Sequence, residues 1–460
     1  MNWCDRNRSL IAWRHVLANT TMFALTLLVT VIAAAVPTIA ATKISEIKTP
    51  GGFTVWMVRE PSIPIIAIEI AFRGGAGLDP VGKEGLARMV SATLDEGAGE
   101  LNSLAFQTRL EELAIGLSFD AHTDTFRATL RTLTRNRVEA FELLASALTQ
   151  PRFDEEPVER IRRQLLADLK RRTQDPDDIA ARAWFAKAFP EHPYGRSSRG
   201  YLDTIAAITA DDLKNFVRTR FARDNLVIGV VGDVAEDEIV QLIDRALGGL
   251  PATASPWTLP EITLPTPGSL TIIKRDIPQS VVIVGMNGPK RDHRDWYTTY
   301  LMNYVLGGGG FTSRLYQEVR EKRGLAYSVY SYLNPYRHAG LVLGGLGTAN
   351  ARVAESVKLY KSEIARMAEH AISQKELVDA KTFLNGSFPL RLDSNGKIAG
   401  IIVAMQLQGL GVDYIEKRAG LIDAVTVEGV REVARRYMRE EDLIIVVVGS
   451  PEGLVEDDGS

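Results

Sequence analysis

Alternating apolar and polar residues predict β-strands in both halves of the chain, and apolar residues three and four positions apart predict helices. The strands expected in the first half are 53–60, 64–75 and 117–133, with helices over 136–150 and 156–174. The strands expected in the second half are 279–288, 325–336 and 338–347, with helices over 351–369 and 373–387. Because strands and helices fall into separate groups, we expect an α+β fold of mostly antiparallel sheets packed with helices.

One unit occurs twice along the chain. Residues 205–233 resemble residues 422–450 at a constant offset, which aligns Thr209 with Thr426 and Gly232 with Gly449. Each copy predicts a helix capped by threonine and then a buried strand that ends in glycine. A repeat of this length indicates duplicated domains and not a solenoid.

The predicted domains are homologous and lie on either side of a proline-rich segment. Their boundaries are 43–250 and 268–455, and the linker is 251–267, which its prolines keep extended.

The N-terminus has the composition of an export signal. A basic start is followed by an uncharged apolar run that ends in a proline and small residues, which predicts a signal peptide over residues 1–41. The mature protein would be periplasmic. Because Cys4 is the only cysteine and lies in the segment that would be removed, the mature protein would have no disulfide or thiol chemistry. The alternative is an uncleaved anchor that holds the protein at the inner membrane, facing the periplasm.

Charge and histidine spacing exclude several classes of function. The 54 basic and 57 acidic residues give a net charge of -3 without a basic run, so a nucleic-acid partner is not expected. No two of the six histidines are three to five residues apart, so HExxH, HxxEH and zinc-finger patterns are absent from the sequence. We interpret His122 and His192 as structural; a site assembled from distant histidines stays open.

The four glycines at 307–310 do not make a nucleotide-binding loop, because the sequence after them lacks the GK[ST] ending. They predict either a flexible turn or a close approach by another backbone segment.

The stretch after these glycines, residues 313–333, carries the clearest candidate chemistry. It predicts a charged helix that ends at Gly324 and a strand with Leu325, Tyr327 and Val329 on one face. A helix folded onto its following strand would bring Arg320 near Tyr327. A guanidinium and a phenol are a donor pair suited to a peptide carbonyl or an oxyanion. The alternative is a solvated arginine and an ordinary strand tyrosine.

The sequence "LGGGGFTSRLYQEVREKRGLAYSVYS", together with the duplication, resembles the pitrilysin/insulinase-type zinc peptidases, or inverzincins. The resemblance extends from about residue 44 to 449 and is nearest to two-domain bacterial members similar to the mitochondrial processing peptidase. It implies two halves that close over a peptide, one with zinc held by HxxEH and a distant glutamate. The other half supplies an arginine and a tyrosine that hold the substrate backbone, and Arg320 and Tyr327 match that pair.

The zinc half departs from the family pattern. The sequence "GLARMVSATLDEGA" places Arg88 and Ala92 where the resemblance implies histidine ligands, and Ser91 where it implies the glutamate. Arginine stays protonated, alanine has no donor atom and serine is a poor general base, so no metal is expected in this chain. The third ligand position falls near Asp168, which we interpret as an acid on a helix surface, since one carboxylate does not hold zinc.

The combination implies a non-zinc subunit of a heterodimeric zinc endopeptidase. Its Arg320 and Tyr327 would bind a peptide or unfolded protein for hydrolysis by an HxxEH-containing homologous subunit, which would hold the zinc. The chain is expected to be inactive alone. Two alternatives stay open: a non-catalytic peptide-binding or assembly protein with vestigial sites, and a metallopeptidase with an unpredicted metal site.

Overall fold

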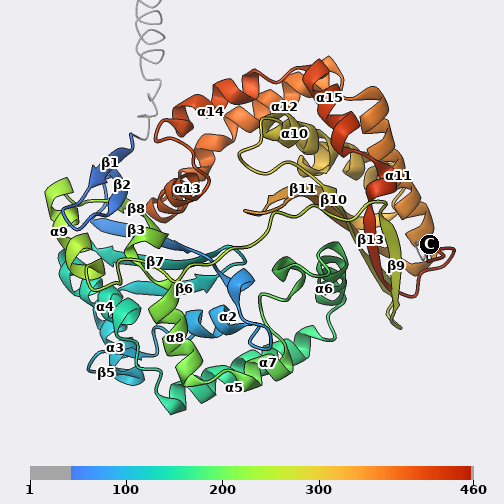
Figure 1. The fold of residues 1–460 in the computed structure, drawn as a ribbon. Coiled ribbons are helices and arrows are strands. Elements are labelled where there is room, and N and C mark those ends of the chain that lie inside the picture. The colour runs from blue at the N-terminus through green and yellow to red at the C-terminus, as the bar shows by residue number, and fades with distance from the viewer. Residues whose placement is uncertain (1–42, 457–460) are drawn as a thin grey trace, which may run out of the picture. The chain divides into compact units, whose positions relative to one another are not determined.

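The computed structural model describes residues 43–456, so the predicted signal peptide lies outside the described residues. Residues of the first half form a six-stranded sheet in the order β1-β2-β8-β3-β7-β6 (Figure 1). Its strands are β1 Ser45–Lys48, β2 Thr54–Arg59, β3 Ile65–Arg73, β6 Gly116–Ala121, β7 Thr125–Leu133 and β8 Leu226–Gly232. Only β2 and β8 run parallel; the other neighbours in this sheet are antiparallel.

The second half repeats this arrangement. Its sheet has the order β11-β12-β10-β13-β9, with β9 and β13 parallel and the other neighbours antiparallel. Its strands are β9 Ser269–Lys274, β10 Gln279–Asn287, β11 Ala326–Pro335, β12 Gly340–Ala349 and β13 Ile444–Gly449. Taken from β9 to β11, the order β9-β13-β10-β12-β11 corresponds strand by strand to β2-β8-β3-β7-β6 of the first sheet. The predicted α+β fold of two homologous halves is therefore confirmed, while the boundaries of the domains stay predictions.

Helices surround both sheets. In the first half they are α2 Leu86–Ser91, α3 Ser103–Glu112, α4 Arg137–Thr149, α5 Glu155–Arg172, α6 Pro176–Ala188, α7 Leu202–Ala207, α8 Ala210–Arg220 and α9 Glu236–Leu247. In the second half they are α10 Trp296–Asn303, α11 Val353–His370, α12 Gln374–Gly386, α13 Asn395–Leu407, α14 Tyr414–Asp423 and α15 Val427–Tyr437. A small sheet of β4 Gly97–Ala98 and β5 Leu101–Asn102 follows α2. Within residues 43–456, the helices are too short or too polar to cross a bilayer.

The duplicated helix–strand unit is present in both halves as predicted. Thr209 and Thr426 cap α8 and α15 by accepting hydrogen bonds from backbone amides three residues on. The strands that follow, β8 and β13, are buried and end at Gly232 and Gly449, whose φ angles are 150° and 153°.

The prediction of one strand over 117–133 is wrong. The segment forms a hairpin, β6 and β7, joined by a tight turn at residues 122–124. Leu117 and Phe119 are buried in β6, whereas Phe126 and Ala128 are buried in β7. The buried positions therefore change from odd to even numbers across the turn. A single straight strand would keep one parity, because its side chains alternate with a period of two.

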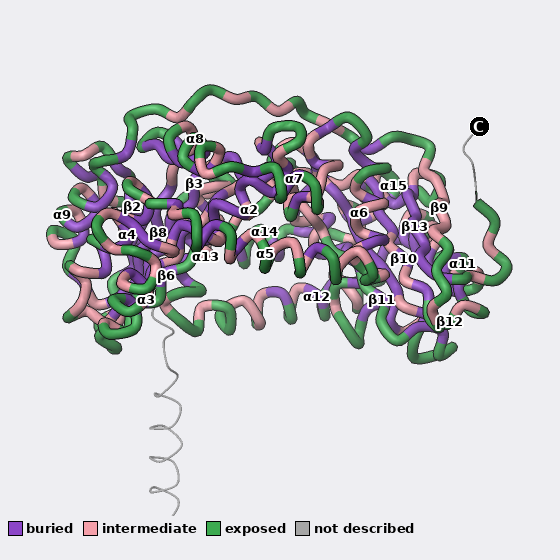
Figure 2. The backbone as a smooth tube through the Cα atoms, turned by 90° about the horizontal axis from the view of Figure 1, so that it is seen from below, coloured by how far each residue is buried: buried purple, intermediate pink, exposed green. Residues whose placement is uncertain are grey.

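One helix from each half packs on the sheet of the other half. Helix α6 packs on β13 and β10, and the indole Nε1 of its buried Trp184 donates to the carbonyl of Ile444 at 2.9 Å. Helix α13 packs on β3 and β8, and Nε2 of Gln406 donates to the carbonyl of Ile228 at 2.8 Å. The sheets are thus buried on both faces, and Figure 2 shows buried backbone running through their strands.

Candidate functional site

Arg320 lies on a short helix that precedes β11. The helix starts at Arg314 and is π-helical over Tyr316–Glu321. Gly324, with φ of 59°, ends it as predicted, and the amide of Gly324 donates to the carbonyl of Arg320 at 2.8 Å. The Arg320 guanidinium stacks over the Tyr316 ring, 4.9 Å from its centroid. This cation–π contact directs an exposed arginine without using its N–H donors.

Tyr327 lies at a β-bulge, and its predicted face is wrong. The register between β11 and β12 shifts between Ala326 and Ser328, so Tyr327 is the extra residue. Leu325 and Val329 are buried, but Tyr327 is 68% exposed. A bulge adds one residue to a strand and turns its side chain away from the expected face.

The helix that carries Arg320 contacts β11, as the sequence predicts. The amide of Leu325 donates to the carbonyl of Val319 at 2.9 Å, and this hydrogen bond holds the start of the strand against the last turn of the helix. Among residues 43–456, neither the Arg320 nor the Tyr327 side chain has a hydrogen-bond or ion-pair partner in the protein. Both groups are therefore free to donate to a ligand; their role in binding one stays a prediction.

Two contacts fix this helix in place. Arg314 makes a bidentate ion pair with Glu376 of α12, with N···O distances of 2.7 and 2.8 Å. Burial alone would raise the pKa of Glu376, but hydrogen bonds from Arg314 and Ser373 outweigh it and lower the pKa to about 2. Gly307 allows the close approach of both β11 and the helix, since a Cβ there would lie 2.4 Å from Oγ of Ser331 in β11 and 2.8 Å from Cδ1 of Leu315 in the helix. Of the two predictions for the glycine run, close packing is confirmed at Gly307.

The degenerate zinc motif lies on α2. Gly85, with φ of 92°, begins this helix, and the buried carboxylate of Asp79 accepts from the amides of Gly85 and Ala87 at 2.9 and 3.1 Å. Ser91 is buried and its Oγ donates to the carbonyl of Arg88 at 2.9 Å, so it is occupied within its own helix. Ala92 is the C-terminal cap of α2.

These residues do not fit a zinc ion. Arg88 and Ala92 offer no ligand, and Asp168, on α5, accepts hydrogen bonds from Arg171 and Arg172. The hydrogen bond from Arg172 is the largest cause that lowers the pKa of Asp168. In residues 43–456, no group of three or more histidine, cysteine, aspartate or glutamate side chains could hold a metal. Asp168 is therefore an acid held by helix arginines, as the sequence indicates.

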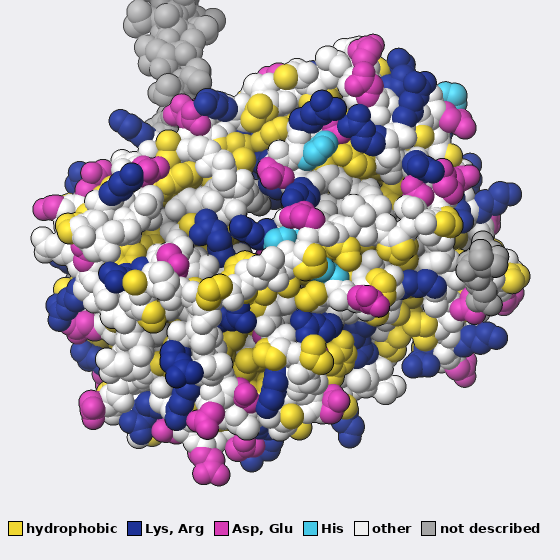
Figure 3. Space-filling model, viewed as in Figure 1, with side chains coloured by type: hydrophobic (Ala, Val, Ile, Leu, Met, Phe, Trp, Pro, Cys, Tyr) yellow, Lys and Arg dark blue, Asp and Glu magenta, His cyan; other side chains and the backbone are white. Residues whose placement is uncertain are grey.

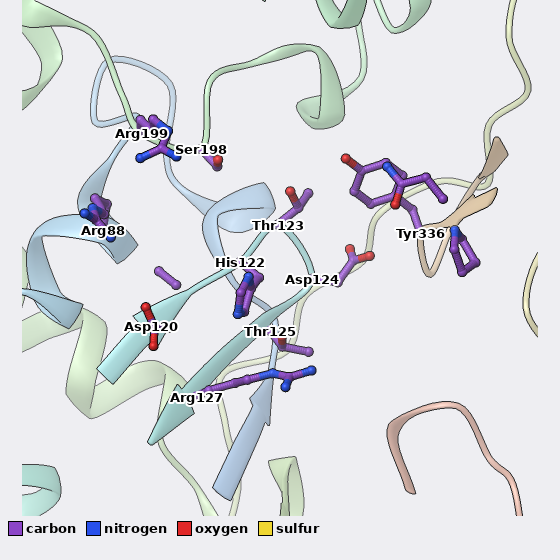
Figure 4. A pocket seen from close by; sticks show the side chains of 13 residues that line it. Arg88, Asp120, His122, Thr123, Asp124, Thr125, Arg127, Ser198, Arg199 and Tyr336 are labelled. Atoms are coloured by element: carbon purple, nitrogen blue, oxygen red, sulfur yellow. The ribbon is translucent and has the colours of Figure 1, made fainter. Parts of the chain in front are cut away.

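Arg88 instead faces a cleft of about 640 Å³ between the two hairpin turns (Figure 4). The β6–β7 turn contributes residues 120–125, and the β11–β12 turn contributes Asn334, Pro335 and Tyr336. Arg127 and Arg199 complete its basic lining. The turns are joined through Asp124, which accepts from the Tyr194 hydroxyl at 2.6 Å and from the Arg337 amide at 2.8 Å. Arg320 and Tyr327 do not line this cleft, although the far end of their strand reaches it.

The two histidines have different surroundings. His192 is buried, where Nδ1 accepts from the Tyr194 amide at 3.1 Å and Nε2 lies 3.1 Å from the Pro260 carbonyl, which fits the structural role predicted for it. His122 instead lies in the cleft beside Asp120 (Figure 4). Burial within the cleft walls and then the charge of Arg127 lower the pKa of His122, so it is neutral at pH 7. The sequence signal for this site was the change of parity at residues 122–124, which marks a turn.

Known proteins resemble this chain along most of its length. A family profile described as peptidase M16 inactive domain matches residues 207–384. The non-peptidase homolog YmxG of Helicobacter pylori is 30% identical over 84% of this chain and 90% of its own. An uncharacterized zinc protease of Streptomyces coelicolor is 29% identical over 86% of this chain and 88% of its own.

A solved structure agrees with these sequence matches. The peptidase M16 inactive domain from Pseudomonas fluorescens superposes with a TM-score of 0.84 at 30% identity, covering 89% of this chain and 98% of its own. The Helicobacter relative is named a non-peptidase homolog, which agrees with the loss of the metal ligands on α2, whereas the Streptomyces relative is named a zinc protease. The chain belongs to the peptidase M16 family, the pitrilysin/insulinase-type zinc peptidases, as a homologue without their zinc-binding motif.

Proposed function

We propose that this chain is the non-zinc subunit of a heterodimeric zinc endopeptidase, and that its Arg320 and Tyr327 bind the peptide backbone at the partner's metal site. The observation that supports this most is the contrast between the two halves. The motif on α2 has neither of the expected histidines nor the glutamate, whereas Arg320 and Tyr327 are exposed and have no hydrogen-bond or ion-pair partner among residues 43–456.

The chemistry of the pair suits an oxyanion. Zinc in the partner would polarise the scissile carbonyl, and two donors from this chain would stabilise the negative charge that develops on its oxygen. The guanidinium stays charged at working pH, and the phenol donates a single directed O–H. Both groups lie next to a bulge and a π-helical turn, two irregularities that are frequent at functional sites.

The test is peptide hydrolysis by a mixture of this chain and an HxxEH-bearing homologue from the same genome. Removing one oxyanion donor costs about 10²–10³ in kcat, so we expect losses of that order for Arg320→Ala and smaller ones for Tyr327→Phe. Lys322→Ala and Tyr332→Phe are the controls, since Lys322 is exposed at the C-terminal cap of the same helix, where it pairs with Glu318, and Tyr332 is exposed on the same strand.

Full activity of the mixture that contains the Arg320→Ala variant would disprove the role of Arg320 in binding the peptide backbone. Stable pairing of the two chains without hydrolysis, whichever metal is added, would instead favour the alternative of a non-catalytic peptide-binding or assembly protein.

We also propose that the two-subunit peptidase acts in the periplasm, on the basis of the signal-like composition of residues 1–41. Cell fractionation and N-terminal sequencing of the mature protein test this. A mature chain that starts near residue 42 supports cleavage, and an intact N-terminus in the membrane fraction supports the anchor.

A further inference from the structure

The place of the lost zinc site has the opposite electrostatic character from a metal site. A zinc site gathers carboxylates and neutral imidazoles around a cation. Here the cleft beside α2 is lined by three arginines, Arg88, Arg127 and Arg199, and by two aspartates, and Figure 3 shows basic side chains and histidines, with a few acidic ones among them, around the hollow in that face. Cationic side chains in a concave site focus a positive potential on whatever enters it.

A second cleft, of about 470 Å³, adjoins the first. The two share Asp124, Thr125, Arg127, Pro335 and Tyr336, so they lie side by side at the hairpin turns, and together they are called the groove here. The second cleft adds Arg73 and Arg337 to the lining. Each cleft is within the size range of ligand sites, and together they suit an extended ligand better than a single small ion.

Two pairs of arginines stand out in this groove, Arg88 with Arg199 and Arg73 with Arg337. Within residues 43–456, no carboxylate lies at ion-pair distance from any of the four guanidinium groups. Burial, then the charges of Arg172 and Arg88, lower the pKa of Arg199, and burial, then the charge of Arg337, lowers that of Arg73. The charges of Asp178 and Asp168 oppose this effect at Arg199, but neither carboxylate lies at ion-pair distance from it. Like charges are thus held near one another in both clefts without a direct ion pair.

The remaining charges of the groove are largely satisfied. Arg127 pairs with Glu69 at 3.3 Å, Lys290 pairs with Glu261 at 2.8 Å, and Asp124 is held by Tyr194 and the Arg337 amide. Asp120 and Asp292 are the carboxylates of the lining that have no side-chain partner among the described residues. Free cations therefore outnumber free anions, and the cations are arranged as pairs.

We propose that this groove binds an acidic peptide segment, with one carboxylate at Arg88 and Arg199 and another at Arg73 and Arg337. Guanidinium groups bind carboxylates through paired, charge-assisted hydrogen bonds, which is why arginine is preferred for this purpose. The site rests on the groove residues alone and would exist whether or not Arg320 and Tyr327 serve a partner's zinc.

The test is fluorescence anisotropy of the full chain with a labelled peptide that has glutamate at alternate positions. Versions with glutamine or lysine at those positions are the comparison peptides. Of the three peptides, we expect only the one with glutamate to bind, with an affinity that falls as the salt concentration is raised. The variants Arg88→Gln/Arg199→Gln and Arg73→Gln/Arg337→Gln should each weaken binding about tenfold or more, because each removes two charge-assisted contacts.

Arg163→Gln/Arg435→Gln is the matched control, since both arginines are exposed on helices, unpaired among the described residues and outside the groove lining. Circular dichroism checks that each variant folds. The salt series on the unmodified chain keeps the test decisive if a variant does not fold.

Equal binding of the glutamate and glutamine peptides, or binding that the groove variants leave unchanged, would overturn the proposal. Inorganic phosphate provides the last arm. If phosphate displaces the labelled peptide as effectively as the unlabelled glutamate peptide does, the groove binds small anions and the assignment to a peptide is wrong.

Discussion

Single residues decide what each half of this protein can do. Arg88 occupies a ligand position of the family's zinc motif and instead faces a basic groove. Arg320 is the residue that the family resemblance predicts to hold substrate, and the cation–π contact with Tyr316 holds its guanidinium while leaving the N–H donors free. Helix α2 thus lacks the zinc ligands that the resemblance implies, while the fold around it is that of the family.

The ion pair between Arg314 and Glu376 gives a pH prediction. Because the pKa of Glu376 is lowered to about 2 from 4.5, its contribution to stability is present above pH 4.5 and is lost as the pH falls toward 2. We expect Glu376→Gln to lower the free energy of unfolding by about 2 kcal/mol at pH 7, after allowance for partial solvent exposure. The measurement is urea denaturation across this pH range.

Glu428→Gln is the control, since Glu428 is exposed in the first turn of α15 and unpaired within residues 43–456. The account of this ion pair fails if the Glu376 and Glu428 variants lose the same stability, or if the deficit of Glu376→Gln is unchanged at pH 3.

At the scale of residues, the orientation of side chains was the hardest feature to predict from the sequence. Arg320 and Tyr327 were chosen from their spacing and the family resemblance, and their role stays a prediction, but the bulge that exposes Tyr327 was missed. A bulge is set by pairing with β12, whose register is not visible in the local alternation. His122 was interpreted as structural, because no sequence pattern reveals that two turns far apart in the chain form a cleft.

At the scale of elements, the close fit of the π-helical segment Tyr304–Gly308 against β11 positions the Arg320 helix that follows. We expect Gly307→Ala to destabilise the protein by about 1–3 kcal/mol, because the added Cβ would lie 2.6 Å from the backbone nitrogen of Ser331, which a strand in a sheet cannot move easily. Thermal denaturation with circular dichroism measures this.

Gly400→Ala is the matched helix variant, because a Cβ at Gly400 of α13 meets no atom within 4 Å. It should stabilise the protein by up to about 1 kcal/mol through helix propensity. If both alanine variants shift the unfolding temperature in the same direction, packing at Gly307 does not position the helix.

Most elements were predictable because long helices and buried strands have strong periodicity. Helices α4, α5, α11 and α12 fall within a few residues of their expected ranges. The β6–β7 hairpin was not predicted, because alternation continues on both sides of a three-residue turn and only the parity of the buried positions changes. A change of the apolar positions from odd to even residue numbers is the local sequence signal for such a turn.

At the scale of the whole described molecule, the exchange of α6 and α13 couples the two halves. Each recipient sheet has a glycine under the incoming helix: a Cβ at Gly285 would lie 2.2 Å from Trp184, and one at Gly229 would lie 2.7 Å from Ile402. The sequence predicted the duplication, but not this exchange, since an apolar helix face does not say which sheet it covers.

Trp184→Ala tests this coupling. Removing a fully buried tryptophan should cost about 3–5 kcal/mol, and hydrogen exchange should accelerate in β10 and β13, on which α6 packs. Trp257→Ala, at a half-buried tryptophan, should cost less. Equal costs for the two variants, with unchanged exchange in β10 and β13, would show that α6 does not support the second sheet.

The most direct test of the central claim is a titration of this chain into a fixed concentration of the HxxEH-bearing homologue, with the rate of peptide hydrolysis as the readout. If this chain completes the partner's active site, the rate rises and saturates at one chain per partner, and this chain alone has no activity. A rate that does not change as the chain is added, or hydrolysis by the isolated chain that a metal chelator abolishes, would contradict the account.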